Sequence, residues 1–540
     1  MWEFLDEAGE AAMRRTRIAA VAATAALVLA GCVSTGAGPT GKRAAGDADI
    51  PELTWAMPGA PRSLDIAHAL DTRSNAAIFA AFDGLLRIDQ EGRLQPALAT
   101  SWTNPDPLTY VYKLRQGVTF WDGKPMTAED VAHSLRRQTD PAEAAETLLY
   151  LGAVKEVTAT GPDEVTVKLS APDPKFKYVP AIVWIVQQKE YVEAAGESLG
   201  SPEKPGMGTG PYRVTRFSPA DGVDFERYDG YWDTKPKVVK LGYKPIPDPE
   251  ALRLAMIAGE VDGTFALPLQ DVRKWERTAE VSLYFTRSVS VNYLSMDVTA
   301  APFDDVHVRR AIAYSVDRQG LLDPLFGGRA RLSSSPVSSL QLEALVGKDK
   351  AAELVGSLPT YPFDLAKAKE ELAKSRHAGG FTVEVPYPTT QPWSRLLLEN
   401  LARNLSTIGI TLVPKGQPDQ QWVANIFAHK DLKLQIMRAG GGTPYPGEML
   451  PIMFGEASAT ANGFNTANFT RPDLEAKLGT LGDDVAPIAD IMRLNAEELP
   501  YVPLFEEDAA HAVRAEHVFS PEPTPWLAGF NWATSLKAAA

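Results

Sequence analysis

The sequence predicts an α/β protein with two or three domains. Short strand-like segments alternate along the chain with segments whose apolar residues recur at helical spacing, and short glycine turns connect them. A chain of 540 residues is also too long for a single hydrophobic core. Apolar residues make up 45% of the sequence and charged residues 23%, which is ordinary for a globular protein.

The first predicted element is an export signal that precedes the folded body. Residues 18–30 are an uninterrupted apolar run, three arginines stand just before it, and Leu29-Ala30-Gly31-Cys32 ends it. This order of features is typical of a signal peptide, and the run is too short for a membrane-spanning helix. Residues 1–31 are therefore predicted to be a signal peptide. Four acidic residues before Met13 do not fit such a segment, which points to Met13 as the true start.

The end of the apolar run predicts a lipid anchor. Leu-Ala-Gly-Cys resembles the bacterial lipobox, in which the cysteine thiol is acylated and becomes the first mature residue. Cys32 is the only cysteine, which excludes an internal disulfide and a metal site built from several thiolates. We expect lipid attached at Cys32 to hold the protein on the extracytoplasmic side of the cell membrane. Residues 32–50 are small, polar and glycine-rich, and they predict a flexible tether.

The charge balance argues against a nucleic acid partner. Lysine and arginine number 54 against 68 aspartates and glutamates, which gives a net charge of −14. Nucleic acid phosphates attract clustered lysine and arginine, so this sign is unfavourable. No later segment is apolar for long enough to span a membrane, and the remainder of the chain is predicted to be a soluble body outside the cell.

Strands and helices of the body are predicted from turn residues and capping residues. Strands are expected at 51–57, at 109–114 paired with 118–121 around Gln116-Gly117, and in a hairpin of 154–159 with 165–169. Thr127, Asp305 and Asp364 are each expected to cap a helix. A further helix over 396–405 leads through a glycine turn into a strand over 410–413, which is typical of α/β packing.

Several short motifs follow one another in a recognisable order. Residues 78–137 contain Pro96-Ala97-Leu98-Ala99, Ser101-Trp102, Leu114-Arg115, Asp122-Gly123 and Thr127 to Val131. Later motifs are Gly208-Thr209-Gly210-Pro211-Tyr212, Gly259-Glu260-Val261-Asp262, Pro302-Phe303-Asp304-Asp305 and Glu498-Leu499-Pro500. This series, over about residues 51–535, resembles the extracellular solute-binding proteins of the oligopeptide, dipeptide and nickel class, family 5.

The resemblance implies a two-lobed fold of the periplasmic-binding-protein type, class C, with three domains. Domain I is expected from residues 51–90, 205–290 and 500–540, domain II from 91–204, and domain III from 291–499. The lobes of such a protein close on a ligand by hinge motion. The implied protein is a monomeric, lipid-anchored receptor without catalytic activity or cofactor. It is expected to capture a small solute, with peptides or peptide-like molecules first, and to deliver it to the permease subunits of an ABC importer.

Ligand contacts are expected between domains I and III. In peptide-binding members, an acidic residue of a Trp-x-x-Asp-Tyr-like segment pairs with the amino group of the peptide. The corresponding stretch here is 437–442, and glycine replaces the acidic residue. Gly440 and Gly441 are predicted to let a ligand approach the backbone closely. Arg438 is predicted to hold a ligand carboxylate in bidentate fashion.

Aromatic and polar residues complete the predicted site. Side chains that can stack on an apolar or ring-bearing ligand are those of Trp393, Trp422 and Tyr445. Asn292 and Tyr293 open the strand that enters domain III, while Arg62 and Ser63 follow the first strand and are predicted to line the cleft. Each of these residues also has a structural interpretation, as core, loop or surface charge, and the sequence leaves both open.

Two other functions are weighed against the receptor. The same fold can serve as a sensor or scaffold lipoprotein without transport. A serine hydrolase is the less favoured alternative: Gly196-Glu197-Ser198-Leu199-Gly200 matches a nucleophile elbow, but a helix-like segment precedes it and a loop follows. The seven histidines lack close metal-ligand spacing, and the triple glycine at 440–442 lacks the Lys-Ser/Thr of a phosphate loop. Neither a metal nor a cofactor is predicted.

Overall fold

The computed structural model describes residues 44–389, 391–526 and 532–540. The predicted signal peptide, Cys32 and most of the predicted tether lie outside these residues. The chain divides into a unit of residues 1–44 and a compact unit of residues 45–540, and the elements below belong to the second unit. Among the described residues, no helix combines the length and apolar character needed to cross a membrane.

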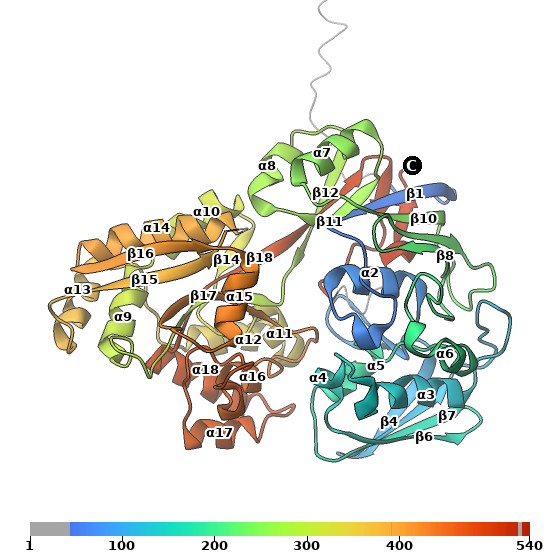
Figure 1. Ribbon diagram of the computed structural model, residues 1–540, viewed down its shortest axis with the longest axis horizontal. Helices are drawn as coiled ribbons and strands as arrows, with labels where there is room; N and C mark the ends of the chain where they lie inside the picture. The colour runs from blue at the N-terminus through green and yellow to red at the C-terminus, as the bar shows by residue number, and fades with distance from the viewer. Residues whose placement is uncertain (1–43, 390, 527–531) are drawn as a thin grey trace, which may run out of the picture. The chain divides into compact units, whose positions relative to one another are not determined.

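The fold is a mixed α/β structure of two lobes (Figure 1). Lobe 1 comprises residues 45–289 and about 508–540, and lobe 2 comprises residues 290 to about 507. Ten strands form a sheet that continues from one lobe into the other. Its main path is, in order, β17 (Leu434–Gly440), β13 (Ser290–Met296), β18 (Tyr501–Arg514), β11 (Gly263–Leu267), β1 (Ile50–Met57), β10 (Val238–Pro245), β9 (Gly222–Arg227) and β8 (Tyr212–Ser218). Two further strands, β12 (Val281–Arg287) and β14 (Ala330–Leu332), also pair with β18. The predicted first strand is confirmed as β1.

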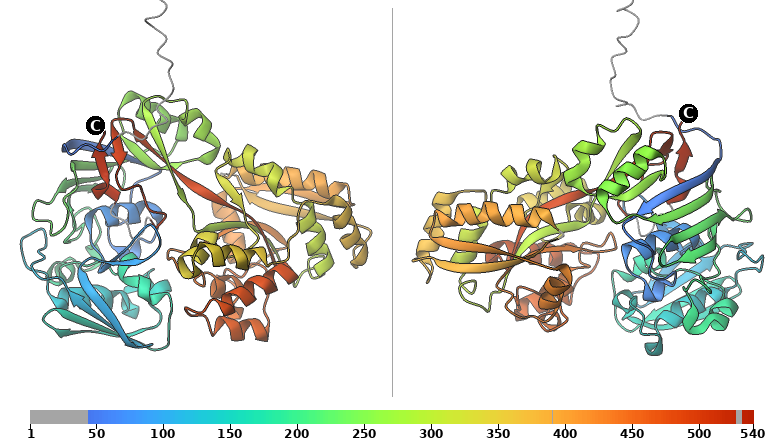
Figure 2. Two further views of the ribbon diagram at one scale, coloured as in Figure 1. Left: turned by 180° about the vertical axis from the view of Figure 1, so that it is seen from behind. Right: turned by 45° about the horizontal axis from the view of Figure 1, so that its top comes forward.

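The lobes are connected twice by strands of this sheet, which run antiparallel to each other. β18 is fourteen residues long because it pairs with different strands at its two ends. Residues 501–505 pair with β13 of lobe 2, and residues 508–514 pair with β12 of lobe 1. β12 and β13 follow one another in sequence with two residues between them, so together they form the second connection between the lobes (Figure 2).

Lobe 1 contains a second, four-stranded antiparallel sheet in the order β4 (Ala99–Asp106), β5 (Thr109–Leu114), β7 (Glu164–Leu169) and β6 (Val154–Gly161). The predicted hairpin is confirmed as β6 and β7. The predicted pairing of 109–114 with 118–121 is wrong, because β4 and β7 already occupy both edges of β5. Residues 118–126 instead form a turn in which the Phe120 amide donates to the Lys124 carbonyl at 2.8 Å.

The remaining elements of lobe 1 are short. Two small strand pairs are β2 (Leu86–Ile88) with β3 (Leu94–Pro96) and β19 (His517–Phe519) with β20 (Leu536–Ala538). The helices are α2 (Thr72–Ala81), α3 (Ala128–Gln138), α4 (Leu148–Leu151), α5 (Val179–Ile182), α6 (Lys189–Ala195), α7 (Pro249–Ala258) and α8 (Val272–Trp275). The predicted cap of α3 is confirmed: the Thr127 hydroxyl accepts from the Asp130 amide, and the Asp130 carboxylate accepts from the Thr127 amide.

Lobe 2 adds a parallel strand pair, β15 (Phe381–Pro388) with β16 (Ile410–Gln417), and most of the helices. These are α9 (Val306–Ser315), α10 (Arg318–Phe326), α11 (Ser339–Val346), α12 (Lys348–Gly356), α13 (Leu365–Lys374), α14 (Pro392–Ser406), α15 (Asp419–Phe427), α16 (Leu450–Phe454), α17 (Pro472–Leu478) and α18 (Ala486–Glu498). The Asp305 and Asp364 side chains cap α9 and α13 as predicted. The helix predicted at 396–405 is confirmed as α14, which begins at a proline.

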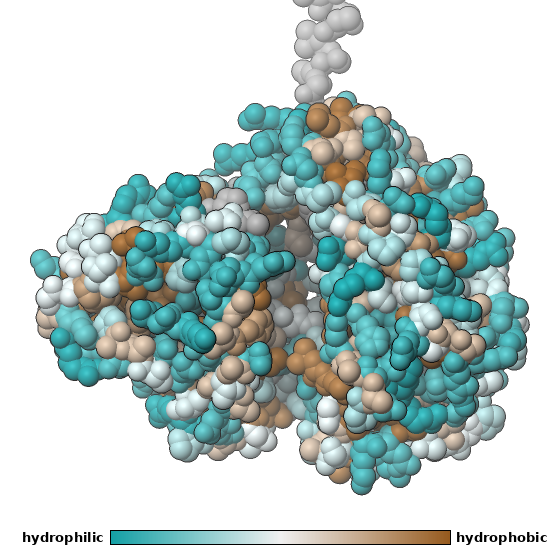
Figure 3. Space-filling view, in the orientation of Figure 1, coloured by the Kyte–Doolittle hydropathy of each residue, from teal (hydrophilic) through white to brown (hydrophobic). Residues whose placement is uncertain are grey.

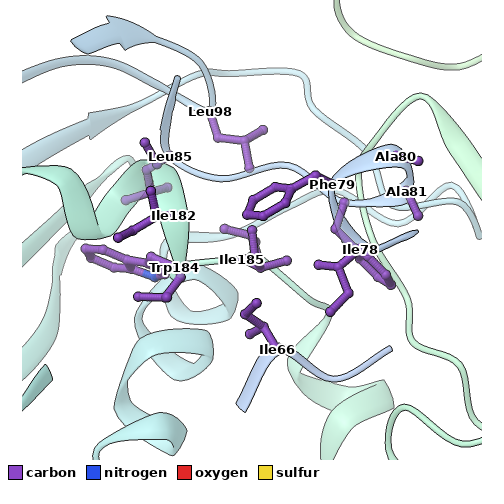
Figure 4. Close-up of a cluster of buried hydrophobic side chains, with 14 of the residues drawn as sticks. Ile66, Ile78, Phe79, Ala80, Ala81, Leu85, Leu98, Ile182, Trp184 and Ile185 are labelled. Carbon is purple, nitrogen blue, oxygen red and sulfur yellow. The ribbon is translucent and has the colours of Figure 1, made fainter. Parts of the chain in front are cut away.

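Large apolar cores lie within the lobes and at their junction. In lobe 1, Phe79 of α2 lies among Leu85, Leu98 and Ile185, and Trp184 packs beside them (Figure 4). In lobe 2, one core covers each face of the β13–β17 strands, because successive side chains of a strand point to opposite faces. One of these cores also includes Met256, Leu267 and Trp275 of lobe 1, so the two lobes share apolar packing where the strands cross.

The first described residues are attached to the body. Ala45 forms a bridge with Ala539, and the Gly46 amide donates to the Ala538 carbonyl at 2.7 Å. The carboxylate of Asp49 lies 3.0 Å from the Arg227 guanidinium. Residues 45–50 were predicted to belong to the tether, and the structure instead ties them to lobe 1.

Candidate functional site

An apolar cavity of about 240 Å³ lies where the two lobes meet. Lobe 1 contributes Met57 at the end of β1 and four aromatic side chains, Phe79, Phe265, Trp526 and Trp532. Lobe 2 contributes the backbone of Gly441 and Gly442, which follow β17. The surface is hollowed between the lobes, and hydrophobic residues gather where they meet (Figure 3). A cavity between lobes that crossing strands connect is a favourable place for a small ligand.

The aromatic side of the cavity is a rigid cluster. The Trp532 ring lies 4.4 Å from the Trp55 ring and 5.1 Å from the Phe265 ring, measured between centroids. The Trp532 indole N–H donates to the Tyr243 hydroxyl at 3.0 Å, which fixes the orientation of the ring. Packed rings of this kind present a large apolar surface at a small entropic cost.

The opposite side of the cavity is backbone because side chains do not fit there. A Cβ atom on Gly440 would lie 2.2 Å from the Ser290 hydroxyl, and one on Gly441 would lie 2.2 Å from a carboxylate oxygen of Glu448. A Cβ on Gly442 would lie 2.8 Å from the Tyr150 hydroxyl. The triple glycine therefore lets the loop lie against its neighbours and exposes peptide groups to the cavity.

A buried carboxyl group holds this glycine loop in place. Glu448 is 7% exposed and accepts hydrogen bonds from the amides of Gly442 at 3.0 Å and Thr443 at 2.9 Å. The Thr443 hydroxyl and the Tyr150 hydroxyl also donate to it. Burial raises the pKa of the Glu448 carboxyl, and these hydrogen bonds oppose that shift. Tyr150 belongs to α4 of lobe 1, so its bond to Glu448 is a contact between the lobes.

Other contacts also cross between the lobes. Lys177 of lobe 1 forms an ion pair with Asp483 of lobe 2 at 2.6 Å, and Asp483 is largely exposed. Gly92 of lobe 1 packs so closely that a Cβ on it would lie 3.1 Å from side-chain carbons of Ala344 and Pro444.

Three of the predicted ligand residues gather in a separate groove of about 200 Å³ in lobe 2, here called the lobe-2 groove: Trp393 of α14, Trp422 of α15 and Arg438 of β17. Trp393 packs on Phe505 with 5.7 Å between ring centroids. The Arg438 side chain is half exposed, and its Nε lies 3.3 Å from a carboxylate oxygen of Glu507. A ligand carboxylate at Arg438 would compete with Glu507.

Other predicted residues are parts of the core or of contacts within lobe 1. Asn292 and Tyr293 have no exposed surface; the Tyr293 ring packs edge-on against Tyr501 at 5.1 Å. Tyr445 is 2% exposed, and burial, together with nearby acidic residues of both lobes, raises its pKa. None of the three lines the interlobe cavity. Gly440 is not among its lining residues either, whereas Gly441 is.

Arg62 and Ser63 lie in the segment that follows β1. The Arg62 guanidinium forms two hydrogen bonds with the Glu146 carboxylate, at 2.8 and 3.0 Å. The Ser63 hydroxyl donates to the Gly200 carbonyl at 3.3 Å. Both side chains therefore attach this segment to neighbouring parts of lobe 1, and neither lines the interlobe cavity.

Sequence reasoning missed most residues of the cavity. Asn75, Phe79, Phe265, Trp526 and Trp532 come from three distant stretches of the chain, and no spacing within one stretch groups them. Trp526 and Trp532 could have been predicted as candidates. They lie near the C-terminus in a segment without a strand or helix pattern, and binding residues are often found in such loops.

The geometry gives little support to a serine nucleophile at Ser198 or to a metal site. Ser198 lies exposed in a 3-10 turn, Gly196–Ser198, directly after helix α6, where a nucleophile elbow requires a preceding strand. Asp65, His68 and Glu143 lie close enough together to hold a metal ion, a grouping that the sequence spacing did not reveal. The Arg137 guanidinium donates to the carboxylates of Asp65 and Glu143, so it already supplies the positive charge that a metal ion would bring.

A further cavity, of about 280 Å³, lies wholly in lobe 2. Its charged side chain is Arg318, which donates to the carbonyls of Tyr361 at 2.8 Å and Pro503 at 3.0 Å. Burial lowers the pKa of Arg318 to about 10. The guanidinium is thus used to join backbone segments of lobe 2.

Known proteins support the interpretation of this architecture. The profile of the bacterial extracellular solute-binding proteins, family 5 (middle region), matches residues 93–461. The glutathione-binding protein GsiB of Escherichia coli is 28% identical over 353 residues. That match covers 64% of this chain and 66% of GsiB, so the chain spans slightly less than two thirds of this relative.

Solved structures share the fold. The ABC transporter substrate-binding protein CtaP of Listeria monocytogenes has a TM-score of 0.80 with 22% identity, covering 91% of this chain and 100% of CtaP. The periplasmic binding protein DppA of Helicobacter pylori, solved with the peptide STSA, has a TM-score of 0.74 with 19% identity, covering 91% and 99%. These proteins are binding proteins, and the two-lobed fold predicted from the sequence is confirmed. The chain belongs to the bacterial extracellular solute-binding proteins, family 5.

Proposed function

We propose that this chain is a lipid-anchored receptor that captures a small solute in the interlobe cavity and delivers it to an ABC importer. Peptides and peptide-like molecules are the first candidates, and glutathione is among them because GsiB, a relative, is a glutathione-binding protein. The observation that carries the proposal is the cavity itself, which has one wall from each lobe. A ligand there contacts both lobes at once and so favours their closed arrangement.

The proposal includes closure of the lobes by bending at the crossing strands. Charged residues gather on β18 where it passes between the lobes, at Glu506, Glu507 and Asp508. Arg287, the last residue of β12, forms a bidentate ion pair with Glu343 of α11, with distances of 2.5 and 2.9 Å. Ion pairs can exchange partners with little loss of packing, which suits a segment that must bend.

The domain limits predicted from the sequence are kept within this proposal. Domain I (51–90, 205–290 and 500–540) would contain β1, β8 to β12 and β18. Domain II (91–204) would contain the four-stranded sheet, and domain III (291–499) the rest of lobe 2. The receptor is proposed to act as a monomer. Cys32 is proposed as the lipid attachment site; replacement by serine should then move the protein from the membrane fraction to the soluble fraction.

Native mass spectrometry tests the receptor function. Protein purified without denaturation from its own host should carry a small molecule that dissociates on unfolding. Gly441→Val, which pushes a side chain against Glu448, should abolish this adduct, while Gly356→Val at the end of α12, where a Cβ meets nothing within 4 Å, should retain it. Absence of any adduct together with no binding in solute screens would refute the receptor function.

The importer is tested separately. Permease subunits should co-purify with the wild-type protein when membranes are solubilised with its solute present. If solute binds but no permease is retained, the same fold acts as a sensor or scaffold, which was the alternative left open by the sequence.

A further inference from the structure

The interlobe cavity contains polar atoms but no charge. Among the described residues that line it, every side chain is apolar, aromatic or neutral, and the polar ones are Thr72 and Asn75 of α2 and the two tryptophans. Its size is below the roughly 300–1,000 Å³ of cavities that enclose a drug-sized ligand. The cavity therefore receives one part of a solute that continues along the cleft.

Two buried polar atoms at this cavity lack a hydrogen-bond partner among the described residues: the Asn75 side-chain oxygen and the Trp526 indole nitrogen. The Asn75 amide nitrogen donates to the Leu70 carbonyl at 3.3 Å, which leaves the oxygen as the free atom. A buried polar atom without a hydrogen-bond partner destabilises the folded state. A small side-chain movement that opens these two atoms to the cavity would let a solute donate to Asn75 and accept from Trp526.

The glycine wall adds a second donor. The Gly441 amide donates to no described residue, whereas the next amide, that of Gly442, is bonded to Glu448. A neutral amide or peptide group, which has one N–H and one carbonyl, matches this set of two donors and one acceptor. The four aromatic rings around it match an apolar body.

A charged amino group finds no partner in the cavity. The nearest carboxyl group behind the glycine wall is that of Glu448, which is 7% exposed and already accepts from Gly442, Thr443 and Tyr150. Moving an ammonium group from water into an apolar cavity without an anion is strongly unfavourable, because the group loses its hydration. Glu448 therefore does not compensate for the glycine that replaces the expected acidic residue in the stretch 437–442.

We infer that the solute presents to this cavity an apolar group whose polar atoms are uncharged, as in an N-acylated peptide. This inference rests on the receptor function proposed above and narrows it to a class of solute. It sets the chain apart from a receptor for free peptide amino ends or for glutathione, which carries an ammonium group and two carboxylates at neutral pH.

Matched peptides test the inference by isothermal titration of protein freed of solute by unfolding and refolding. Acetyl-Leu-Phe-amide should bind at least tenfold more tightly than Leu-Phe-amide, which differs only in its charged amino end, and more tightly than glutathione. Equal or tighter binding of Leu-Phe-amide or glutathione would overturn the inference. Binding of none of the three would overturn it as well. The receptor function would then be tested independently, by whether native mass spectrometry detects a bound solute.

Three variants locate the effect. Trp526→Phe keeps the ring and removes the indole N–H, and it should weaken acetyl-Leu-Phe-amide several-fold. Asn75→Asp places a carboxylate in the cavity and should shift the preference towards Leu-Phe-amide. Trp422→Phe is the matched control, because its indole nitrogen is also buried without a partner but lines the lobe-2 groove, and it should change neither affinity. Thermal melting confirms that each variant folds. A larger loss in Trp422→Phe than in Trp526→Phe would contradict the inference.

Discussion

The two walls of the interlobe cavity are built on different principles. The lobe-1 wall is made of side chains: Phe265 and Trp532 pack against each other's rings, and Trp526 lines the wall with them. The lobe-2 wall is made of backbone, because Gly441 leaves no room for a side chain above Glu448. The first wall offers apolar area and the second offers peptide groups. Together they favour a solute with an apolar body and neutral hydrogen-bonding groups. Substitutions in the lobe-1 wall should mainly lower stability, whereas substitutions in the lobe-2 wall should mainly lower the affinity for solute.

The largest effect is expected from removing a ring of the lobe-1 wall. Trp532 is 2% exposed and packs on Trp55 and Phe265. Trp532→Ala should lower the free energy of unfolding by about 3–5 kcal/mol, because it leaves a cavity in a tight cluster. Chemical denaturation measures this loss. Trp393→Ala in the partly buried lobe-2 groove is the control, and an equal loss there would show that the lobe-1 wall is not specially rigid.

The lobe-1 wall should also weaken in acid. His511 is fully buried, lies edge-on to Phe265 at 5.3 Å and shares a hydrogen bond with Thr286 at 2.9 Å. Burial lowers its pKa from 6.5 to about 4, so the unfolded chain binds a proton in this range and the folded chain does not. The free energy of unfolding should therefore fall as pH drops from about 6.5 towards 4, by about 3 kcal/mol in all.

Denaturation at several pH values in wild type and His511→Gln isolates this contribution. The difference in unfolding free energy between the two proteins should change with pH over that window and stay constant above pH 7. A difference that stays the same from pH 4 to 7 would show that His511 does not supply this dependence.

A side chain on the lobe-2 wall should affect binding more than folding. Gly441→Ala places a methyl group against the Glu448 carboxylate, and such overpacking costs about 1–3 kcal/mol. The displaced loop no longer presents the Gly441 amide, so the affinity for solute should drop at least tenfold. Titration calorimetry and thermal melting separate the two effects. Gly442→Ala, which meets the end of the Tyr150 side chain, should be milder, and the reverse order would argue against the Glu448 contact.

The smallest effect is expected where the walls approach each other at the surface. The Lys177–Asp483 ion pair joins the lobes but is well exposed at Asp483. Exposed pairs contribute less than about 1 kcal/mol and are screened by salt. Asp483→Asn should therefore weaken solute binding by less than fivefold at low ionic strength, with no difference from wild type at high salt. A large loss that persists at high salt would mean that this contact controls closure.

The sequence was sufficient to predict structural features that depend on residues close together in the chain. Thr127, Asp305 and Asp364 cap helices as expected, because capping needs only residues within one turn. The pairing of 109–114 with 118–121 was wrong, since the true partners of β5 include β7, about fifty residues away, which no local turn reveals. The fold itself was predictable from the motif order, which is a property of the whole chain.

The site was predictable only in part. Gly441 was reached through the motif at 437–442, and the structure places it at the cavity. Trp393, Trp422 and Arg438, which were predicted for the same ligand site, lie together in the lobe-2 groove and do not line the interlobe cavity. The aromatic wall was missed because β11, α2 and the C-terminal segment meet only in the folded protein. Contacts between distant segments decide the lining of a cavity, and their residue types alone do not indicate which will meet.

The position of the solute tests the central claim most directly. A crystal structure of the protein with the solute that co-purifies from its host should show that solute between Trp526 and Gly441, with its neutral polar atoms facing Asn75 and the indole nitrogen. Solute bound instead in the lobe-2 groove between Trp393 and Trp422, or in the cavity beside Arg318, would contradict the account.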